Sequence, residues 1–237
     1  MLIDQVSGLQ YFNHFVGQSS DIFRSALFLS DRLPWLLYAL TLCSMWYAGT
    51  VGLLPERPGG LLRSHARYVT LLTLVAMPPL FVVSKVIQKF VESTRPMLQE
   101  DLLLIPLPPK EWQTVIASFD MQGSFPSDHA VVFFLLATVI FALNFWWGMV
   151  ALAVVTFFSL LRVAVGFHWP MDVLVGALIG MAAGAVILVM VRFTEPRFVR
   201  WTQRPMKLWL VAALFYLFLY DCSYKFNHIM GLMQHGS

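Results

Sequence analysis

The longest charge-free stretch of the chain, from Ala130 to Leu161, is the feature that most restricts its fold. A helix needs about 20 mainly apolar residues to cross the ~30 Å hydrocarbon layer of a membrane. This stretch is too long for one crossing, and Asn144-Phe-Trp-Trp-Gly148 interrupts it near its middle. The pattern therefore predicts two membrane helices joined by a tight turn.

Four further runs with no charged residue predict additional membrane helices: 33–55, 68–84, 173–191 and 208–220. The last run is short, and it spans only if Trp209 and the following Cys-Ser-Tyr-Lys segment lie at the interface. Gly176, Gly180 and Gly184 recur every four residues, which favours close packing against another helix. The expected fold is an all-α, polytopic membrane bundle of about six transmembrane helices.

The composition agrees with a membrane protein, because 58% of the residues are apolar and 12% are charged. Soluble domains carry about 25% charged residues. The net charge of +3 is too small to indicate a nucleic-acid partner. Cys43 and Cys222 lie in apolar stretches without metal-type spacing, which argues against a disulfide framework and a zinc site.

The chain divides into an N-terminal segment (1–32), one membrane domain (33–225) and a C-terminal tail (226–237). In the first segment, apolar residues alternate with polar ones in a pattern typical of an amphipathic helix at the membrane interface. These apolar residues are Ile3, Val6, Leu9, Phe12, Val16 and Ile22. No basic start precedes an apolar core, so a cleavable signal peptide is not expected.

The distribution of Lys and Arg predicts the orientation in the membrane. The loops at 56–67 and 192–207 hold eight basic residues, whereas 1–32 and 92–128 hold nine acidic and four basic ones. Cytoplasmic loops carry the basic excess. The first pair of loops is therefore expected in the cytoplasm and the second pair, with both termini, on the outer side of the membrane.

Three polar clusters remain at helix ends on the outer side: 85–96, 126–129 and 162–172. In the first, Lys85, Gln88 or Lys89, Glu92 and Arg95 recur every three to four residues, which predicts one polar helical face. Such groups are costly to bury in a membrane, and their chemical types complement each other. A shared functional site is the expected explanation.

Phosphoryl transfer suits these residues best. Arg95 and Arg162 can bind phosphate oxygens and neutralise charge in the transition state. Ser127 adds a hydroxyl, and backbone N–H groups of the Pro-Ser-Asp-His turn at a helix start could face an anion. His168 can act as the nucleophile if Asp172 holds its second ring nitrogen.

A second histidine, His129, can then protonate the leaving oxygen.

His168 and Asp172 could instead be ligands of a metal hydrolase, but too few further ligands are in view. A small transporter with a polar path is another reading, although transporters tend to place such groups in mid-membrane rather than at one boundary.

The three clusters resemble the signature of the type 2 phosphatidic-acid phosphatase superfamily, whose soluble relatives include vanadium haloperoxidases. That signature has an Arg-Pro ending a helix, a Pro-Ser-x-His turn, and Arg-x5-His-x3-Asp, here Arg95-Pro96, Pro126 to His129, and Arg162 to Asp172. The resemblance covers about residues 85–190. It implies a six-helix bundle, a phosphohistidine on His168, and neither metal nor cofactor.

The resemblance also implies a phosphate-binding group of Arg95, Ser127, Asp128 and Arg162, completed by a lysine. That lysine normally lies seven residues before the first Arg, where this chain has Gln88, so Lys85 and Lys89 are both candidates. The Ser that usually precedes the third-motif Arg is Leu161 here.

The Asp128 variant and the VGFHWPMDVLVG segment look most like the bacterial branch that dephosphorylates undecaprenyl pyrophosphate outside the cytoplasmic membrane. Alternatives of the same fold are a lipid A phosphatase or phosphotransferase and a phosphatidylglycerophosphate phosphatase. The expected partners are a lipid-linked phosphate and membrane lipids. The sequence carries no signal for the oligomeric state.

Overall fold

A computed structural model describes residues 2–51, 63–91, 93–99, 101–117 and 123–193. In these residues the chain forms helices and no strand. The helices are α1 (Leu2–Val16), α2 (Ser20–Val51), α3 (Arg63–Phe90), the short 3-10 helix η1 (Pro96–Leu98), α4 (Pro109–Ala117), α5 (Asp128–Leu143), α6 (Phe145–Ala164) and α7 (Pro170–Phe193).

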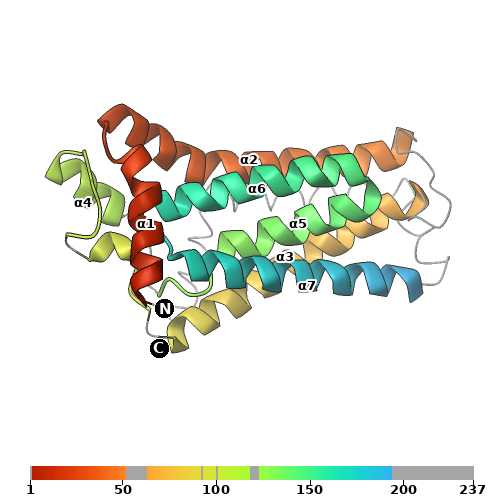
Figure 1. Cartoon of the computed structure of the whole chain (residues 1–237). Coiled ribbons are helices and arrows are strands. Elements are labelled where there is room, and N and C mark those ends of the chain that lie inside the picture. The colour runs from red at the N-terminus through yellow and green to blue at the C-terminus, as the bar shows by residue number, and fades with distance from the viewer. Residues whose placement is uncertain (1, 52–62, 92, 100, 118–122, 194–237) are drawn as a thin grey trace.

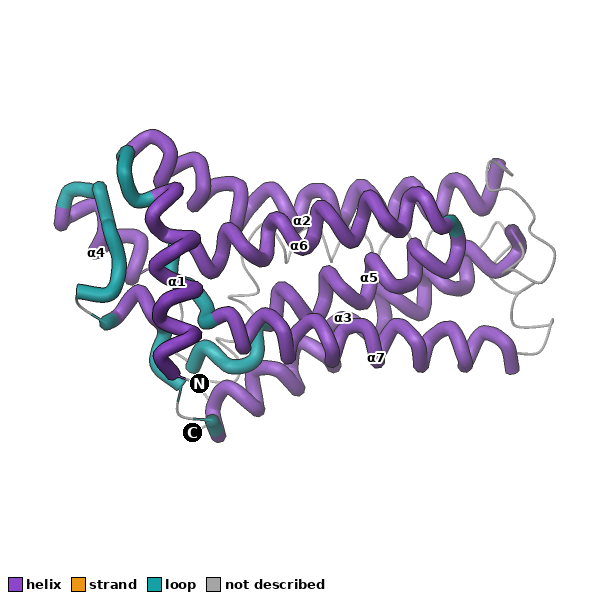
Figure 2. Tube along the Cα trace, in the orientation of Figure 1, coloured by secondary structure: helices purple, strands orange, loops and turns teal. Residues whose placement is uncertain are grey.

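Helices α2, α3, α5, α6 and α7 run alongside one another as a bundle (Figures 1 and 2). Four of them, α2, α3, α6 and α7, are long and apolar enough to cross a membrane, and α5 is a shorter apolar helix. The all-α membrane bundle is thus confirmed for the described part of the chain. The crossing expected at 208–220 lies outside the described residues.

The turn between α5 and α6 forms where the sequence predicts it. Asn144 ends α5, and its side-chain oxygen accepts hydrogen bonds from the N–H groups of Trp146 and Trp147 at 3.0 and 3.1 Å. The side chain thereby caps the start of α6, because those N–H groups have no partner inside the helix. One cap therefore divides the charge-free stretch into two helices.

Helix α5 lies at the centre and packs most extensively on α7, then on α6 and α3. A Cβ at Gly176 would lie 2.6 Å from the Ser127 carbonyl oxygen, and one at Gly180 would meet the Val131 carbonyl even more closely. The glycines thus let α7 approach the α5 backbone closely. This confirms the packing role expected for them.

The first membrane helix begins earlier than the sequence suggests. Helix α2 starts at Ser20 rather than near residue 33, so Asp31 and Pro34 lie inside it. Its first turns are held because Phe23 and Ala26 pack into a buried apolar cluster at this end of the bundle. Tertiary packing therefore extends the helix through a segment whose polar residues indicated an interfacial boundary.

Helix α1 lies across one end of the bundle (Figure 1) and contacts α6, α7 and α2. It buries Leu9 and Val16 and exposes Tyr11 and Phe15, so it is two-faced. The buried Asn13 amide donates to the carbonyl of Ala164 at 3.0 Å, at the last residue of α6. This bond ties α1 to the helix end from which the functional residues emerge.

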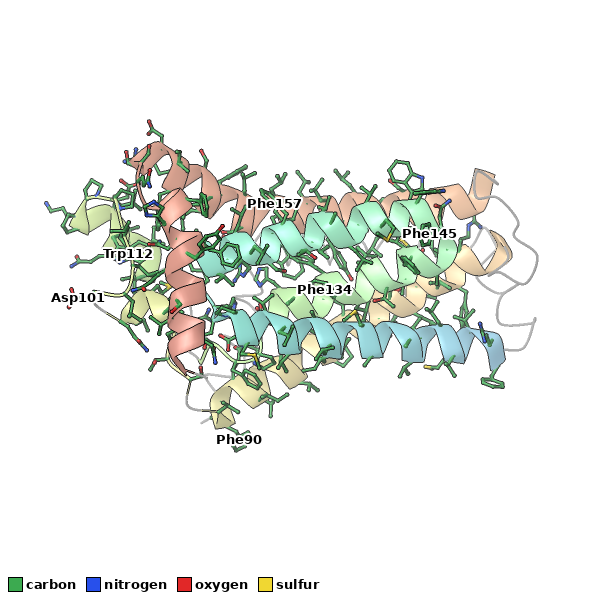
Figure 3. The ribbon with its side chains drawn as sticks, in the orientation of Figure 1. Phe90, Asp101, Trp112, Phe134, Phe145 and Phe157 are labelled. Atoms are coloured by element: carbon green, nitrogen blue, oxygen red, sulfur yellow. The ribbon has the colours of Figure 1, made fainter. Side chains whose placement is uncertain are left out.

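Large apolar side chains also cover the outside of the bundle. Phe157 is 53% exposed and Phe145 is 39% exposed, whereas Phe134 is 9% exposed and lies among the helices (Figure 3). In a soluble monomer, so much exposed apolar surface would be unusual. On membrane helices, it is the surface that faces lipid.

Candidate active site

The C-terminal ends of α3 and α6 and the N-terminal ends of α5 and α7 meet at the end of the bundle that α1 crosses (Figures 1 and 2). Each of the three polar sequence clusters lies at one or two of these ends. Six of the expected site residues are buried: Arg95, Ser127, Asp128, Arg162, His168 and Asp172. The fold thus collects buried charge at one boundary.

His168 is placed by the turn that ends α6. Gly166 adopts a φ of +89°, which L side chains rarely adopt, and Phe167 N–H donates to the Arg162 carbonyl at 2.9 Å. A left-handed glycine just after a helix reverses the chain in this way. The turn directs His168 into the protein, where its side chain is fully buried.

The Nδ1 atom of His168 lies 2.9 Å from the backbone carbonyl of Ser124 and 3.7 Å from Asp172 Oδ2. The closest partner is therefore a carbonyl, not the carboxylate that the sequence indicated. A carbonyl oxygen can only accept, so Nδ1 carries the proton and Nε2 keeps its lone pair. Asp172 reinforces this tautomer from a longer distance.

Asp172 has a further task in holding the loops together. Its Oδ2 accepts the Trp169 N–H at 2.9 Å, and its backbone carbonyl accepts the Ser127 N–H at 3.0 Å. The residue thereby joins the start of α7 to the turn that begins α5. Its carboxylate therefore positions the loop as well as His168.

Burial, together with the nearby charges of Arg162 and Arg95, lowers the pKa of His168 from its ordinary value to about 4, although the contact with Asp172 raises it. A neutral ring with a free Nε2 at neutral pH is the form that a nucleophile requires.

Arg162 lies beside that nitrogen, because its Nη2 is 3.4 Å from His168 Nε2. Its Nη1 donates to the carbonyl of Ser30 on α2 at 3.0 Å. Its Nε is buried with no hydrogen-bond partner among the described residues. A guanidinium has five N–H donors, so Arg162 retains donors that can bind an anion next to His168.

The Ser30 carbonyl is available because of Pro34. A helical carbonyl normally accepts the N–H four residues later, and proline has none. The open acceptor on α2 is filled by Arg162 from α6. A proline inside a membrane helix thus leaves a backbone carbonyl open, and the buried Arg162 side chain satisfies it.

Arg95 reaches the site from an extended segment rather than from a helix. Helix α3 ends at Phe90, and Arg95 has β-region dihedral angles of −68° and 141°. The expectation that Arg95 continues the polar helical face is therefore wrong, because a residue before proline avoids the α-helical region. Arg95 Nη1 donates to the Phe167 carbonyl at 3.0 Å, next to His168.

The backbone N–H groups of the Pro-Ser-Asp-His turn are mostly occupied. Ser127 N–H bonds to the Asp172 carbonyl, His129 N–H to Asp128 Oδ1, and Ala130 N–H to Ser127 Oγ. Ser127 is the N-cap of α5. The sequence indicated that these N–H groups could face an anion. In this structure most of them donate to acceptors of the protein itself, so side chains are the principal donors for an anion.

Of the two candidate lysines, Lys85 faces the site. Its Nζ lies 3.4 Å from Asp128 Oδ2 and 3.1 Å from the Gln88 side-chain oxygen. Gln88 is buried and donates to the Pro126 carbonyl at 2.8 Å. Lys89 is exposed. Gln88 thus anchors the α5 turn from the position seven residues before Arg95.

His129 contacts two side chains through its two ring nitrogens. Nδ1 is 2.8 Å from Asp128 Oδ1, and the Trp35 indole N–H donates to Nε2 at 2.9 Å. An indole N–H can only donate, so Nε2 is the acceptor and Nδ1 carries the proton. The ring is neutral in this arrangement.

Several participants come from α2 and from backbone that the sequence did not single out: Ser30, Trp35 and the Ser124 carbonyl. Asp31 also acts electrostatically on Arg162. In the sequence, Asp31 and Pro34 are the features of α2 that could have indicated its part in the site. In the described part of the chain, no three His, Cys, Asp or Glu residues are placed to hold a metal ion.

The comparisons with known proteins agree with this geometry. The PAP2 superfamily matches residues 67–196, which is more than half of the chain. A protein from Bacillus licheniformis, named bacitracin transport permease protein BcrC, is 32% identical over 68 residues, covering 29% of this chain and 34% of the relative. The match thus spans about a third of that relative's length. No solved structure matches significantly.

Proposed function

Because the chain belongs to the PAP2 superfamily, which supports a membrane lipid phosphatase, we propose that it hydrolyses undecaprenyl pyrophosphate. The products are undecaprenyl phosphate and inorganic phosphate. The observation that carries the proposal is the buried His168, whose Nε2 lone pair lies 3.4 Å from an arginine with a free donor. His168 can attack a phosphorus atom while the arginine binds the oxygens on it.

In the first step, His168 Nε2 forms a bond to the terminal phosphorus, and the bond from that phosphorus to the bridging oxygen breaks. Arg162 and Arg95 neutralise the charge on the transferring group, the usual electrostatic task in such reactions. His129, carrying a second proton on Nε2, gives it to the leaving oxygen. Asp128 holds the Nδ1 proton throughout.

In the second step, water attacks the phosphohistidine. One water proton moves to His129 Nε2, the new P–O bond forms, and the P–N bond breaks. His168 recovers its lone pair and His129 its acidic proton, so the net reaction consumes one water. The Lys85–Asp128 contact keeps that carboxylate ionised and aimed at His129. No step calls for a metal ion.

The proposed site faces outward from the inner membrane of a bacterium. The basic loops at 56–67 and 192–207 adjoin the ends of α2, α3 and α7 that are remote from the site (Figure 1). Cytoplasmic loops carry the excess of Lys and Arg, which supports an extracytoplasmic site that recycles the lipid carrier of wall polymers.

Transport is the second candidate, supported by the name of the Bacillus relative. The charged groups described above belong to helix ends that meet at one end of the bundle rather than at its midplane. That arrangement favours chemistry at the boundary over a path through the membrane.

Phosphate release from purified protein tests the proposal. The panel is undecaprenyl pyrophosphate, a shorter prenyl pyrophosphate, phosphatidylglycerophosphate and lipid A, each with and without EDTA. We expect the prenyl pyrophosphates to react fastest and EDTA to have no effect. Preferential release from another lipid would reassign the substrate, and loss in EDTA with recovery on adding a divalent ion would contradict the metal-free mechanism. No release from any lipid would favour transport.

A further inference from the structure

We infer that Trp35 is a positioning residue that holds the proposed acid, His129, in its resting form until the lipid chain of the substrate enters a groove beside it. The inference rests on the function proposed above. Trp35 belongs to α2, outside the three sequence clusters. It contacts His129 through a hydrogen bond and a ring contact, and its ring also packs against Tyr38 and Phe133.

The hydrogen bond occupies the nitrogen that catalysis needs. Because Nδ1 of His129 faces Asp128, only Nε2 can reach a leaving oxygen. In this structure Nε2 accepts the Trp35 N–H at 2.9 Å. A protonated Nε2 and an indole N–H are both donors, so the ring cannot become the acid while Trp35 stays in place.

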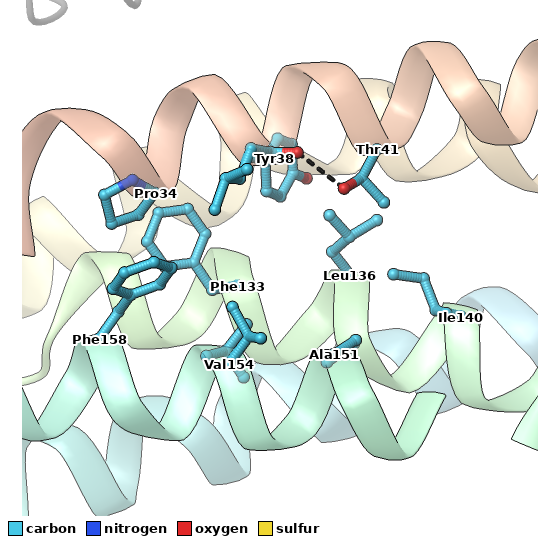
Figure 4. A pocket seen from close by; sticks show the side chains of 12 residues that line it. Pro34, Tyr38, Thr41, Phe133, Leu136, Ile140, Ala151, Val154 and Phe158 are labelled. Atoms are coloured by element: carbon cyan, nitrogen blue, oxygen red, sulfur yellow. Dashed lines mark hydrogen bonds between the residues drawn. The ribbon is translucent and has the colours of Figure 1, made fainter. Parts of the chain in front are cut away.

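The ring contacts connect Trp35 to an apolar groove. Its indole packs edge-on against Phe133 at 5.1 Å and Tyr38 at 6.1 Å between ring centroids. Both neighbours line a groove between α2, α5 and α6 that has about 410 Å³ of empty space, part of it open to the outside. The side chains labelled in Figure 4 show this lining.

The groove fits one occupant, the hydrocarbon chain of the substrate. Its lining is almost entirely apolar, and the Thr41 hydroxyl is bonded to its own helix at Leu37. Leu37 and Val154 are also exposed on the outer surface of two membrane-crossing helices, so the groove reaches the side that faces lipid. At its other end, Phe133 contacts the His129 ring at 5.7 Å.

A chain in this groove would press on Phe133 and Tyr38, the two rings on which Trp35 rests. Moving Trp35 frees Nε2 of His129 for a proton and then for the leaving oxygen. A phosphate ester without a chain leaves the groove empty and Trp35 in place. Trp35 thereby links recognition of the lipid to availability of the acid, a form of specificity by assembly of the site.

The test compares three phosphate monoesters in the full-length protein. Ethyl phosphate and hexadecyl phosphate share a poor leaving group but differ in chain, and p-nitrophenyl phosphate needs little help from an acid. In W35F the ring remains and the N–H donor is lost. We expect kcat for ethyl phosphate to rise about three- to tenfold, the scale of one hydrogen bond, with less than about a twofold change for the other two esters.

The matched control is W46F, the same substitution on α2 at a tryptophan that stacks with Arg67 away from the site. It should leave all three rates unchanged. An equal change in W35F for every ester, or no change for ethyl phosphate, overturns the inference while leaving the phosphatase intact. If the unsubstituted protein hydrolyses undecaprenyl pyrophosphate but none of the three esters, the inference is overturned and the proposed function stands. Failure with the pyrophosphate as well overturns both.

A second measurement is made on the unsubstituted protein, and a variant serves only to assign its signals. Nitrogen NMR of the histidine rings in the substrate-free protein, with His129 assigned from H129N, reports the tautomer directly. We expect the proton on Nδ1 and an acceptor Nε2. A proton on Nε2 would overturn the inference.

Discussion

His168 lies in the loop between α6 and α7, and His129 lies on the first turn of α5; the two rings differ in what holds them. His168 is fully buried and is fixed through the backbone carbonyl of Ser124. His129 is 12% exposed and is held by the side chains of Asp128 and Trp35. A backbone anchor suits a nucleophile that stays in place, whereas side-chain anchors suit an acid that must exchange a proton.

The largest effect should come from removing the fixed ring. H168A should lower phosphate release by about 10⁴-fold or more, the scale observed when a catalytic nucleophile is lost. Melting temperature provides the control for folding. A variant with intact folding and more than about a tenth of the activity would show that the backbone-held ring is not the nucleophile.

The effect of removing His129 should depend on how much the leaving group needs a proton. H129A should reduce turnover of an alkyl phosphate about 10²- to 10³-fold, within the range for general acid catalysis. The loss should shrink for p-nitrophenyl phosphate, whose leaving group departs without a proton. The same loss for both esters would mean that the two histidines do not divide the roles of nucleophile and acid.

The side chains that hold His129 can be tested at Lys85, which contacts Asp128. K85A should lower activity about 10- to 100-fold, the scale of one charged hydrogen bond, because Asp128 loses its cation. K89A is the matched control, since Lys89 is exposed on the same helix. A larger loss in K89A would identify that residue as the replacement for the lysine of the family.

A smaller effect is expected from disturbing the Ser30 carbonyl contact that anchors Arg162 beside His168. P34A restores an N–H that competes with Arg162 for the Ser30 carbonyl. We expect kcat/KM to fall about three- to tenfold. Pro34 also lines the apolar groove, but a loss that acts through Arg162 should be the same for ethyl and hexadecyl phosphate. A loss confined to the hexadecyl ester would assign the proline to the groove instead.

The smallest effect is expected from mild acid. Because the pKa of His168 is lowered to about 4, only about 3% of the rings should be protonated at pH 5.5, against about 90% for an ordinary histidine. The rate for p-nitrophenyl phosphate, corrected for ionisation of the ester, should therefore hold to pH 5.5 and fall only near pH 4. A fall centred near pH 6.5 would contradict the buried, neutral ring.

Much of this architecture could be predicted from the sequence. Charge-free runs indicate membrane helices directly, since few other structures tolerate them. The residue types of Arg95, Arg162 and His168 predict an anion site, which stays a prediction. The structure brings them together at four helix ends.

The remaining features depend on contacts between distant segments. The Ser124 carbonyl carries no side-chain signal, and the bond from Trp35 to His129 joins residues 94 positions apart. Pro34 was visible in the sequence, but its effect on Arg162 requires α2 and α6 to be adjacent. Residue types predicted the chemistry, whereas tertiary packing determined which groups hold each ring.

The most direct test of the central claim is to trap the covalent intermediate. Brief reaction with a ³²P-labelled substrate, followed by a denaturing quench at high pH, should give protein-bound phosphate that is stable in alkali and labile in acid. The label should map to His168, persist in H129A and be absent from H168A. Label on another residue, or turnover in H168A through a labelled protein, would contradict the account.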